Sequence, residues 1–311
     1  MAFAFLFPGQ GSQSLNMMDG FAAPIVKETF DEASEALGED LWAMLKADSA
    51  EAINQTINTQ PLMLAAGVAT YRAWLAAGGA TPTHFAGHSL GEYSALVAAD
   101  ALDFDDAVRL VRLRAEAMQS AVPAGEGAMA AVLGLDDAEI VLACAEAAAG
   151  DVVSAVNFNA PGQVVIAGSK AAVDRAIAAC KARGAKRAMP LPVSVPSHCA
   201  LMRPAADKLA EALVGISVNV PLVPVIHNAD VASYTDPAAI RDALVRQLYS
   251  PVRWTETIRL LAAQGVLHQA ECGPGKVLAG LNKRIEASVV SFALTNDAAL
   301  ETTLDTLAAL N

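Results

Sequence analysis

The sequence is poor in basic residues and has little charge of either sign. It holds 21 lysines and arginines against 33 aspartates and glutamates, so the formal net charge is −12. An acidic surface repels phosphate backbones, and we therefore expect no nucleic-acid partner. Charged residues make up 17% of the chain and hydrophobic residues 54%. This composition excludes an intrinsically disordered protein.

Cysteines are few and widely spaced. The four are Cys144, Cys180, Cys199 and Cys272. None of them forms a CxxC pair, which is typical of a protein in the reducing cytoplasm rather than of a secreted disulfide framework. We therefore expect free thiols and a cytoplasmic location.

A long hydrophobic run is also missing. Residues 52–71 carry no charge but include Asn54 and Pro61, whereas a membrane span needs about 20 mostly apolar residues. The apolar start over residues 1–7 is short, and the first basic residue is Lys27, so no secretory signal is expected. We expect no membrane segment, and we take the first residue as the mature N-terminus.

The chain is long enough for about two domains, at 311 residues. Short apolar runs alternate with Ala-rich amphipathic stretches, which indicates an α/β fold. Residues 2–7 and 84–87 predict buried strands. Helices are expected between them, the longest over 59–78, and then over 90–98 and 104–120.

The order of elements changes in the middle of the chain. The pattern there predicts strand, helix, strand, strand, helix and strand over 127–133, 136–148, 151–158, 163–168, 170–183 and 186–191. This βαββαβ order is that of a ferredoxin-like unit. Helices are then expected over 200–214, 237–249, 254–263 and 298–309, and strands over 222–226 and 265–270. We expect a large α/β domain over 1–122 plus 194–311, with a small domain over 123–193 inserted.

One motif has the form of a nucleophile elbow. Gly87-His88-Ser89-Leu90-Gly91 matches the pattern GxSxG and lies between an apolar strand and a helix. The glycines permit a tight turn, and Ser89 would lie at a helix N-terminus, where backbone N–H groups can stabilise an oxyanion. The alternative is a glycine-rich turn in which the serine is incidental.

A serine nucleophile needs a base, and the chain has five histidines. His198 lies in an irregular segment at the expected domain boundary, where catalytic groups often lie. His227 follows an apolar strand and is the second candidate. Cys199 has no elbow around it and is interpreted as a packing residue. For the remaining histidines a core or surface role is expected.

Arg114 has no partner on its own helix. In the helix predicted over 104–120, Arg109 has acids one turn before it and Arg112 has Glu116 one turn after it, whereas Arg114 has neither. Arg114 lies at the edge of an apolar stripe, and a half-buried arginine needs a carboxylate or a phosphate. That anion can belong to the protein, as a tertiary salt bridge, or to a substrate.

Basic residues gather in one segment of the small domain. Residues 170–187 hold six basic residues and one acid, although the chain as a whole is acidic. Such a run can be a solvated helix face. It can also be a docking surface for an anionic ligand or an acidic partner.

In its motifs the chain resembles the malonyl-CoA:acyl carrier protein transacylases and the related acyltransferase domains of polyketide synthases. The stretches that carry the resemblance are FPGQGSQ (7–13), GHSLGE (87–92), the Arg114 helix, NFN (157–159), PSH (196–198), QLYSPVRW (247–254) and GPG (273–275). They cover essentially the whole chain in family order. The resemblance implies an α/β-hydrolase-like large domain with an inserted ferredoxin-like small domain.

The resemblance also implies roles for single residues. Ser89 would accept the acyl group, and His198 would be its general base. The backbone carbonyl of Gln247 would orient the imidazole in place of a triad carboxylate. The backbone N–H groups of Gln10 and Leu90 would form the oxyanion hole.

Substrate choice would depend mainly on Arg114, which would hold the free carboxylate of a malonyl group. Ser197 precedes the histidine here, as it does in free-standing bacterial enzymes of the family. Malonyl-selective polyketide domains usually carry phenylalanine at that position. Selectivity is therefore better argued from Arg114 than from Ser197.

The implied reaction is a ping-pong transfer in fatty-acid biosynthesis. Malonyl-CoA would acylate the serine, and the phosphopantetheine thiol of acyl carrier protein would then take the malonyl group. No metal or cofactor is implied, and we expect malonyl-CoA and acyl carrier protein as the partners of a monomer. The alternatives are a serine esterase or thioesterase, a carrier-binding module without activity, and an acyltransferase that supplies a polyketide pathway.

Carrier docking needs a local basic face. The carrier proteins of this pathway are acidic, and so is this chain, so the overall charges repel each other. We expect docking at the end of the basic segment, on Lys181, Arg183, Lys186 and Arg187.

Overall fold

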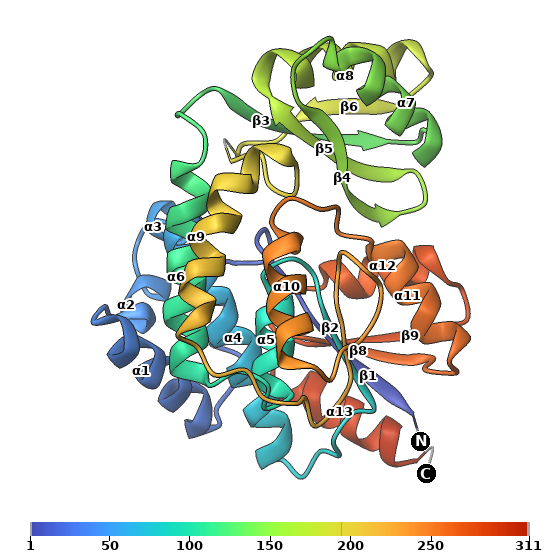
Figure 1. Ribbon diagram of the computed structural model, residues 1–311. Coiled ribbons are helices and arrows are strands. Elements are labelled where there is room, and N and C mark those ends of the chain that lie inside the picture. Colours follow the sequence, from blue (N-terminus) through green and yellow to red (C-terminus); the bar gives the residue numbers. More distant parts are fainter. Residues whose placement is uncertain (1, 194, 310–311) are drawn as a thin grey trace.

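The computed structural model describes residues 2–193 and 195–309. Residues 1, 194 and 310–311, at which expected domain ranges begin or end, lie outside the described residues. The chain is a mixed α/β structure with two separate sheets, one parallel and one antiparallel (Figure 1). The α/β class predicted from the sequence is confirmed.

The larger sheet has five strands in the order β7-β2-β1-β8-β9, and every neighbouring pair is parallel. Its strands are β1 (Phe3–Phe7), β2 (His84–Gly87), β7 (Val225–Ile226), β8 (His268–Cys272) and β9 (Val290–Leu294). All five residues of the central strand β1 are buried. Such burial is expected for a parallel sheet that carries helices on both faces.

Side chains of β1 alternate between two cores, because successive residues of a strand point to opposite faces. Phe3, Phe5 and Phe7 pack in the core with α1 (Pro24–Leu37), α4 (Thr56–Ala76), α5 (Gly91–Ala98) and α6 (Phe104–Ser120). Ala4 and Leu6 pack on the other face with α11 (Trp254–Ala263) and α12 (Val277–Ile285). The helices outside the antiparallel unit also include α2 (Leu41–Leu45), α3 (Glu51–Asn54), η1 (Ala200–Met202), α9 (Arg203–Val214), α10 (Pro237–Gln247) and α13 (Asp297–Ala308).

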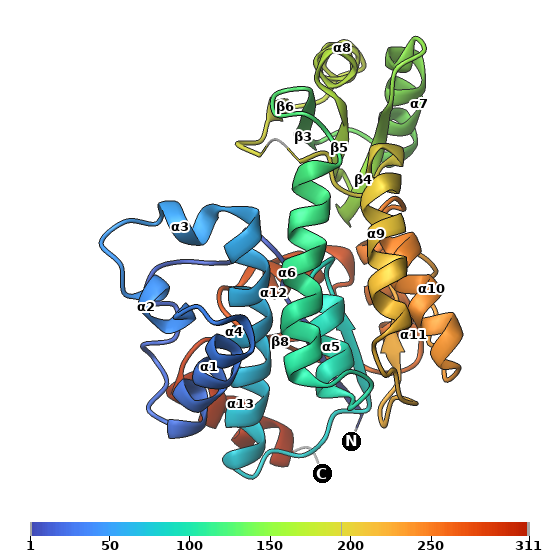
Figure 2. The same cartoon turned by 60° about the vertical axis from the view of Figure 1, so that its left-hand side comes forward.

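The smaller sheet is antiparallel, in the order β4-β5-β3-β6. Its unit consists of β3 (Gly127–Leu133), α7 (Asp137–Ala148), β4 (Val153–Ala160), β5 (Gln163–Ser169), α8 (Lys170–Ala182) and β6 (Arg187–Pro190). Helices α7 and α8 cover its outer face, at the top of Figures 1 and 2. On the inner face Met129, Val156 and Val165 pack with Cys199, which has the packing role expected for it.

Most predicted elements match the structure within a few residues, and the strands in the last third of the chain differ most. Strand β7 begins at Val225 rather than at residue 222. Strand β8 begins at His268 rather than at residue 265. Gly265 instead lies in the turn that follows α11, with a φ of 79° and an N–H that donates to the Ala262 carbonyl. Strand β9 has no counterpart among the predicted strands, because it lies at the sheet edge and only Leu294 is buried in it.

The described helices include none that combines the length and the apolar character needed to cross a membrane.

Candidate active site

Ser89 stands at a strained turn between β2 and α5. Its φ is 52°, in the left-handed region that costs a non-glycine residue about 1–3 kcal/mol. The flanking glycines leave no room for side chains. A Cβ atom at Gly87 would lie 1.9 Å from the Gly91 carbonyl carbon, and one at Gly91 would lie 2.0 Å from the Phe7 carbonyl oxygen. The GxSxG motif therefore forms the tight strand–helix turn that the sequence predicted.

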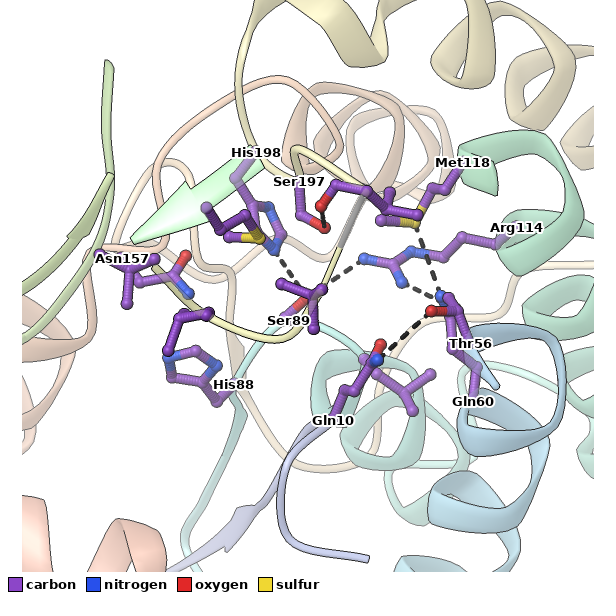
Figure 3. A pocket seen from close by; sticks show the side chains of 16 residues that line it. Gln10, Thr56, Gln60, His88, Ser89, Arg114, Met118, Asn157, Ser197 and His198 are labelled. Carbon is purple, nitrogen blue, oxygen red and sulfur yellow. Dashed lines mark hydrogen bonds between the residues drawn. The ribbon is translucent and has the colours of Figure 1, made fainter. Parts of the chain in front are cut away.

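His198 is the histidine that contacts Ser89 (Figure 3). Its Nε2 lies 2.7 Å from Ser89 Oγ, and its Nδ1 lies 2.8 Å from the Gln247 carbonyl oxygen. A carbonyl oxygen only accepts, so Nδ1 carries the proton and Nε2 accepts from the serine hydroxyl. Burial, followed by the neighbouring Arg114 charge, lowers the pKa of His198 to about 3. The imidazole is therefore neutral at physiological pH.

The other histidines near the elbow are bonded elsewhere. The second candidate base, His227, lies with its Nδ1 2.7 Å from Glu92 Oε1, to which it donates. His88 bonds through Nε2 to Asn159 Oδ1 at 2.8 Å. Of the two candidate bases, the structure brings His198 to the serine and leaves His227 away from it.

Arg114 reaches the same point from α6. The sequence placed it at the edge of the apolar face, but in the structure the residue is only 1% exposed. Its guanidinium donates to Gln60 Oε1 at 2.8 Å, to Gln247 Oε1 at 3.0 Å and to Ser89 Oγ at 3.3 Å. All three partners are neutral. Within residues 2–193 and 195–309, Arg114 takes part in no ion pair.

The guanidinium of Arg114 is also short of acceptors. Its Nε has no hydrogen-bond partner among the described residues, and burial lowers the pKa of Arg114. A buried cation whose hydrogen-bond partners are all neutral is stabilised when an anion enters beside it. An anionic group next to the serine hydroxyl would supply the charged partner that Arg114 lacks.

The prediction that Arg112 pairs with an acid on its own helix was wrong. The spacing indicated Glu116, but Arg112 Nη2 donates to Glu39 Oε2 at 2.6 Å. Glu39 follows α1, which packs against α6, whereas Glu116 is exposed to solvent. Packing of two helices has replaced the weak pair expected along one helix.

Gln10 and Leu90 line the same cavity as Ser89. Leu90 immediately precedes α5, and N–H groups at the start of a helix have no partner within the helix. The N–H of Ser89 is already taken, because it donates to Asn228 Oδ1 at 2.7 Å. The backbone N–H groups of Gln10 and Leu90 are therefore better candidates for an oxyanion hole than that of Ser89.

The serine, the histidine and the arginine face one cavity of about 150 Å³ between the two units (Figure 3). The antiparallel unit and the segment after it supply a mostly apolar wall, with Met129, Asn157, Val165, Leu191 and Val193. Asn157 Oδ1 is buried there without a partner in the described part of the chain. The described residues include no group of three His, Cys, Asp or Glu side chains that could hold a metal ion.

Three residues of the site had no prediction from the sequence. Gln60 holds the guanidinium, and Asn228 holds the Ser89 N–H. Glu92 lies beneath the elbow, fully buried. Of the three, only Glu92 could have been noticed in the sequence, because it is the one charged residue on a helix whose other residues are apolar or small.

The four basic residues expected to bind the carrier lie outside the cavity. They are Lys181, Arg183, Lys186 and Arg187. The three other than Arg183 are exposed. Arg183 forms ion pairs with Glu139 and Glu146 of its own unit, so part of its charge is neutralised there.

The model of the acyl transferase domain family matches residues 4–291. The chain belongs to this family. A member from Escherichia coli (strain K12), a malonyl CoA-acyl carrier protein transacylase, is 62% identical over 97% of this chain and 99% of its own length. A transacylase of the same name from Bacillus subtilis (strain 168) is 46% identical over 98% of this chain and 96% of its own.

Solved structures of the family have the same fold. The malonyl CoA-acyl carrier protein transacylase of Coxiella burnetii matches with a TM-score of 0.97 and 51% identity, over 99% of this chain and 98% of that one. A malonyl-transacylase solved in complex with a type II PKS acyl-carrier protein also matches with a TM-score of 0.97, at 56% identity, over 98% of this chain and 100% of that one.

Proposed function

We propose that the protein is a malonyl-CoA:acyl carrier protein S-malonyltransferase of fatty-acid biosynthesis. The observation that carries this proposal is the buried guanidinium of Arg114, which lies 3.3 Å from Ser89 Oγ and has only neutral partners. A malonyl thioester has one free carboxylate, and this is the anion that the site lacks. The name of the relatives from E. coli and B. subtilis agrees with this activity.

The first half-reaction loads the enzyme. Ser89 gives its hydroxyl proton to His198 Nε2 as Oγ attacks the thioester carbonyl of malonyl-CoA. The carbonyl oxygen becomes an oxyanion, which the N–H groups of Gln10 and Leu90 stabilise. The C–S bond then breaks, CoA leaves as a thiol with the proton from His198, and a malonyl ester remains on Ser89.

The second half-reaction transfers the malonyl group from the enzyme to the carrier protein. The phosphopantetheine thiol of the carrier gives its proton to His198 and attacks the ester, whose C–O bond breaks as Ser89 regains a proton. Nδ1 of His198 is hydrogen-bonded to the Gln247 carbonyl rather than to a carboxylate. The imidazole is therefore a weaker base than the histidine of a catalytic triad. A thiol ionises far more readily than water. This difference favours transfer over hydrolysis.

The test is acid-quenched labelling with radiolabelled malonyl-CoA. A transferase holds the label until holo-carrier protein is added and then passes it on. A serine thioesterase releases free malonate without a carrier, and a carrier-binding module takes up no label, so either result contradicts the proposal. Carriers of fatty-acid and polyketide systems, offered in turn, separate the two pathways. A polyketide carrier is included because one matching structure was solved in complex with a type II PKS acyl-carrier protein.

The rate of serine loading should not titrate with His198 between about pH 5 and 8. With its pKa lowered to about 3, the imidazole stays in its base form across this range, whereas an ordinary histidine titrates near 6.5. The measurement is the burst of CoA release as a function of pH. A rate that falls by half as the pH drops to about 6.5 would contradict this assignment.

The same lowered pKa has a consequence for stability. Between about pH 3 and 6.5 the unfolded chain binds a proton at His198 that the folded chain does not. Unfolding therefore becomes easier as the pH falls through this window. Well above pH 6.5 both states are unprotonated at His198, so it makes no difference to stability there.

We also propose the finer division of the fold. Residues 1–122 plus 194–311 would form an α/β-hydrolase-like domain, and 123–193 an inserted ferredoxin-like domain. In support, the elbow follows a strand of the parallel sheet, and the antiparallel unit follows the βαββαβ order with its own hydrophobic core. Ser89, His198 and Arg114 contact one another within a single chain, so a second copy is not needed to assemble them, and we propose action as a monomer. The four cysteines are free, which fits the cytoplasm.

We propose that the carrier docks on the basic end of the antiparallel unit. Lys181, Lys186 and Arg187 are exposed there, and Arg183 is partly neutralised. An acidic carrier would be drawn to this local charge although the chain as a whole repels it. The exposed residues are therefore the ones to reverse.

Reversing two of these charges, in Lys186→Glu with Arg187→Glu, should raise the KM for carrier protein about tenfold and flatten its salt dependence. Loading by malonyl-CoA should change less. Both half-reactions are measured at low and high salt. The control, Lys27→Glu with Lys46→Glu, makes the same change in net charge on α1 and beside α2. An unchanged KM with its salt dependence intact would place docking on the larger unit.

A further inference from the structure

A buried acid lies directly beneath the catalytic turn. Glu92, on the first turn of α5, is 0% exposed. Its carboxylate accepts three hydrogen bonds, from His227 Nδ1 at 2.7 Å, from the Asn228 N–H at 2.9 Å and from Gln247 Nε2 at 2.9 Å. A carboxylate only accepts, so each of these groups must turn a donor toward it.

For Gln247 this requirement decides the orientation of the amide. Because its Nε2 faces Glu92, its Oε1 faces the other way, where it accepts from Arg114 Nη2 at 3.0 Å. The same Nε2 also donates to the Ser89 carbonyl at 2.9 Å. If the amide were reversed, its NH₂ group would face the guanidinium, and two donors would meet.

Gln247 thereby joins two parts of the site. Its backbone carbonyl holds Nδ1 of His198, and its side chain holds Arg114. Glu92 contacts the side chain alone and lies outside the cavity. The base and the guanidinium can therefore be disturbed separately.

We propose that Glu92 is a positioning residue for substrate selectivity: it orients the Gln247 amide, and through it the Arg114 guanidinium that receives the malonyl carboxylate. This rests on the proposed function, in which Arg114 binds that carboxylate. Burial lowers the pKa of Arg114, and the nearby negative charge of Glu92 acts against that effect.

Two substitutions at Glu92 separate this role from simple packing. Glu92→Met has a similar length but no acceptor, so the Gln247 amide loses its orienting partner. Glu92→Gln keeps one oxygen for Asn228 and Gln247 and turns its NH₂ toward His227. His227 can adapt by moving its proton to Nε2, since that atom has no partner among the described residues.

The measured quantity is the ratio of malonyl to acetyl ester formed on the enzyme, by intact mass after mixing with equal concentrations of the two CoA thioesters. Glu92→Met should lower this ratio about tenfold, the effect expected from one misplaced hydrogen bond to a charged group. Glu92→Gln should restore it to within about threefold of the wild type. The control is Glu271→Met, which removes another buried acid that caps α12 through the Ala279 N–H.

Two further variants make the outcome decisive. If Glu92→Met does not fold, Gln247→Met takes its place, because it removes the amide and keeps the backbone carbonyl, and the same fall in the ratio is expected. Arg114→Ala is measured alongside. An unchanged ratio in Arg114→Ala would overturn the proposed function. If the ratio changes in Arg114→Ala but not in Glu92→Met or Gln247→Met, the role of Glu92 alone is overturned. The same holds if the ratio falls equally in Glu92→Met and Glu271→Met.

Discussion

The Ser89→Ala variant should form no malonyl ester when it is mixed with malonyl-CoA, while its melting temperature stays close to that of the wild type. Ser89 Oγ is the hydroxyl within 2.7 Å of His198 Nε2, so its loss removes the acyl acceptor itself. The loss of a nucleophile costs on the order of 10⁶ in rate in serine hydrolases. The fold should tolerate the change, because alanine removes one oxygen and keeps the same backbone.

Intact-mass spectrometry decides this prediction. The matched control is Ser197→Ala, which removes a second hydroxyl that lines the same cavity and should leave the ester in place. A malonyl adduct that persists on Ser89→Ala would assign the nucleophile to another residue.

Arg114→Ala should reverse the substrate preference of the protein rather than abolish its activity. A malonyl carboxylate would lose its charged hydrogen bonds, each worth about 1.5–3 kcal/mol, so malonyl loading should fall about a hundredfold or more. Acetyl-CoA has no carboxylate to lose, and its loading should hold or rise. The measurement is the initial rate of ester formation with each thioester.

The control for Arg114 is Arg112→Ala, because Arg112 lies on the same helix and pairs with Glu39 outside the cavity. It should lower stability by about 1–3 kcal/mol, because an arginine side chain that is only 13% exposed loses a pair of two hydrogen bonds to Glu39. Its malonyl and acetyl rates should keep their ratio. If both rates fall together in Arg114→Ala, the arginine is structural and does not bind the substrate carboxylate.

Local sequence patterns predicted most of the fold. The helix expected over 104–120 agrees with α6 at both ends. It starts there because Asp103 caps it, with a side-chain oxygen that accepts from the Asp106 N–H. The strand over 127–133 likewise agrees with β3. Such elements depend on residues a few positions apart, and these are the interactions that a pattern can represent.

The elbow could be predicted for the same reason, because Gly87 and Gly91 are needed within the turn itself. The distant residues that hydrogen-bond to the elbow and to Arg114 could not be predicted. Asn228 binds the Ser89 N–H across 139 residues, and Gln247 Oε1 meets Arg114 across 133. The sequence alone does not tell which distant side chains will meet.

For Arg114, one property could be predicted from the sequence and another could not. The missing partner on its helix was visible in the spacing, and it indicated correctly that the partner lies elsewhere. Its full burial was not visible, because Gln60 of α4 and Gln247 of α10 close over it only in the folded chain. The resemblance to a known family, rather than spacing, supplied the expected substrate carboxylate.

An experimental structure of the protein trapped as the malonyl ester would show directly whether Arg114 binds the substrate carboxylate. Arg114 is buried beside Ser89 with Nε unpartnered in the described chain. We expect a malonyl group bonded to Ser89 Oγ. Its carbonyl oxygen should lie within hydrogen-bond distance of the Gln10 and Leu90 N–H groups, and its free carboxylate should pair with the guanidinium. A malonyl carboxylate that points to solvent, with no bond to Arg114, would contradict this expectation.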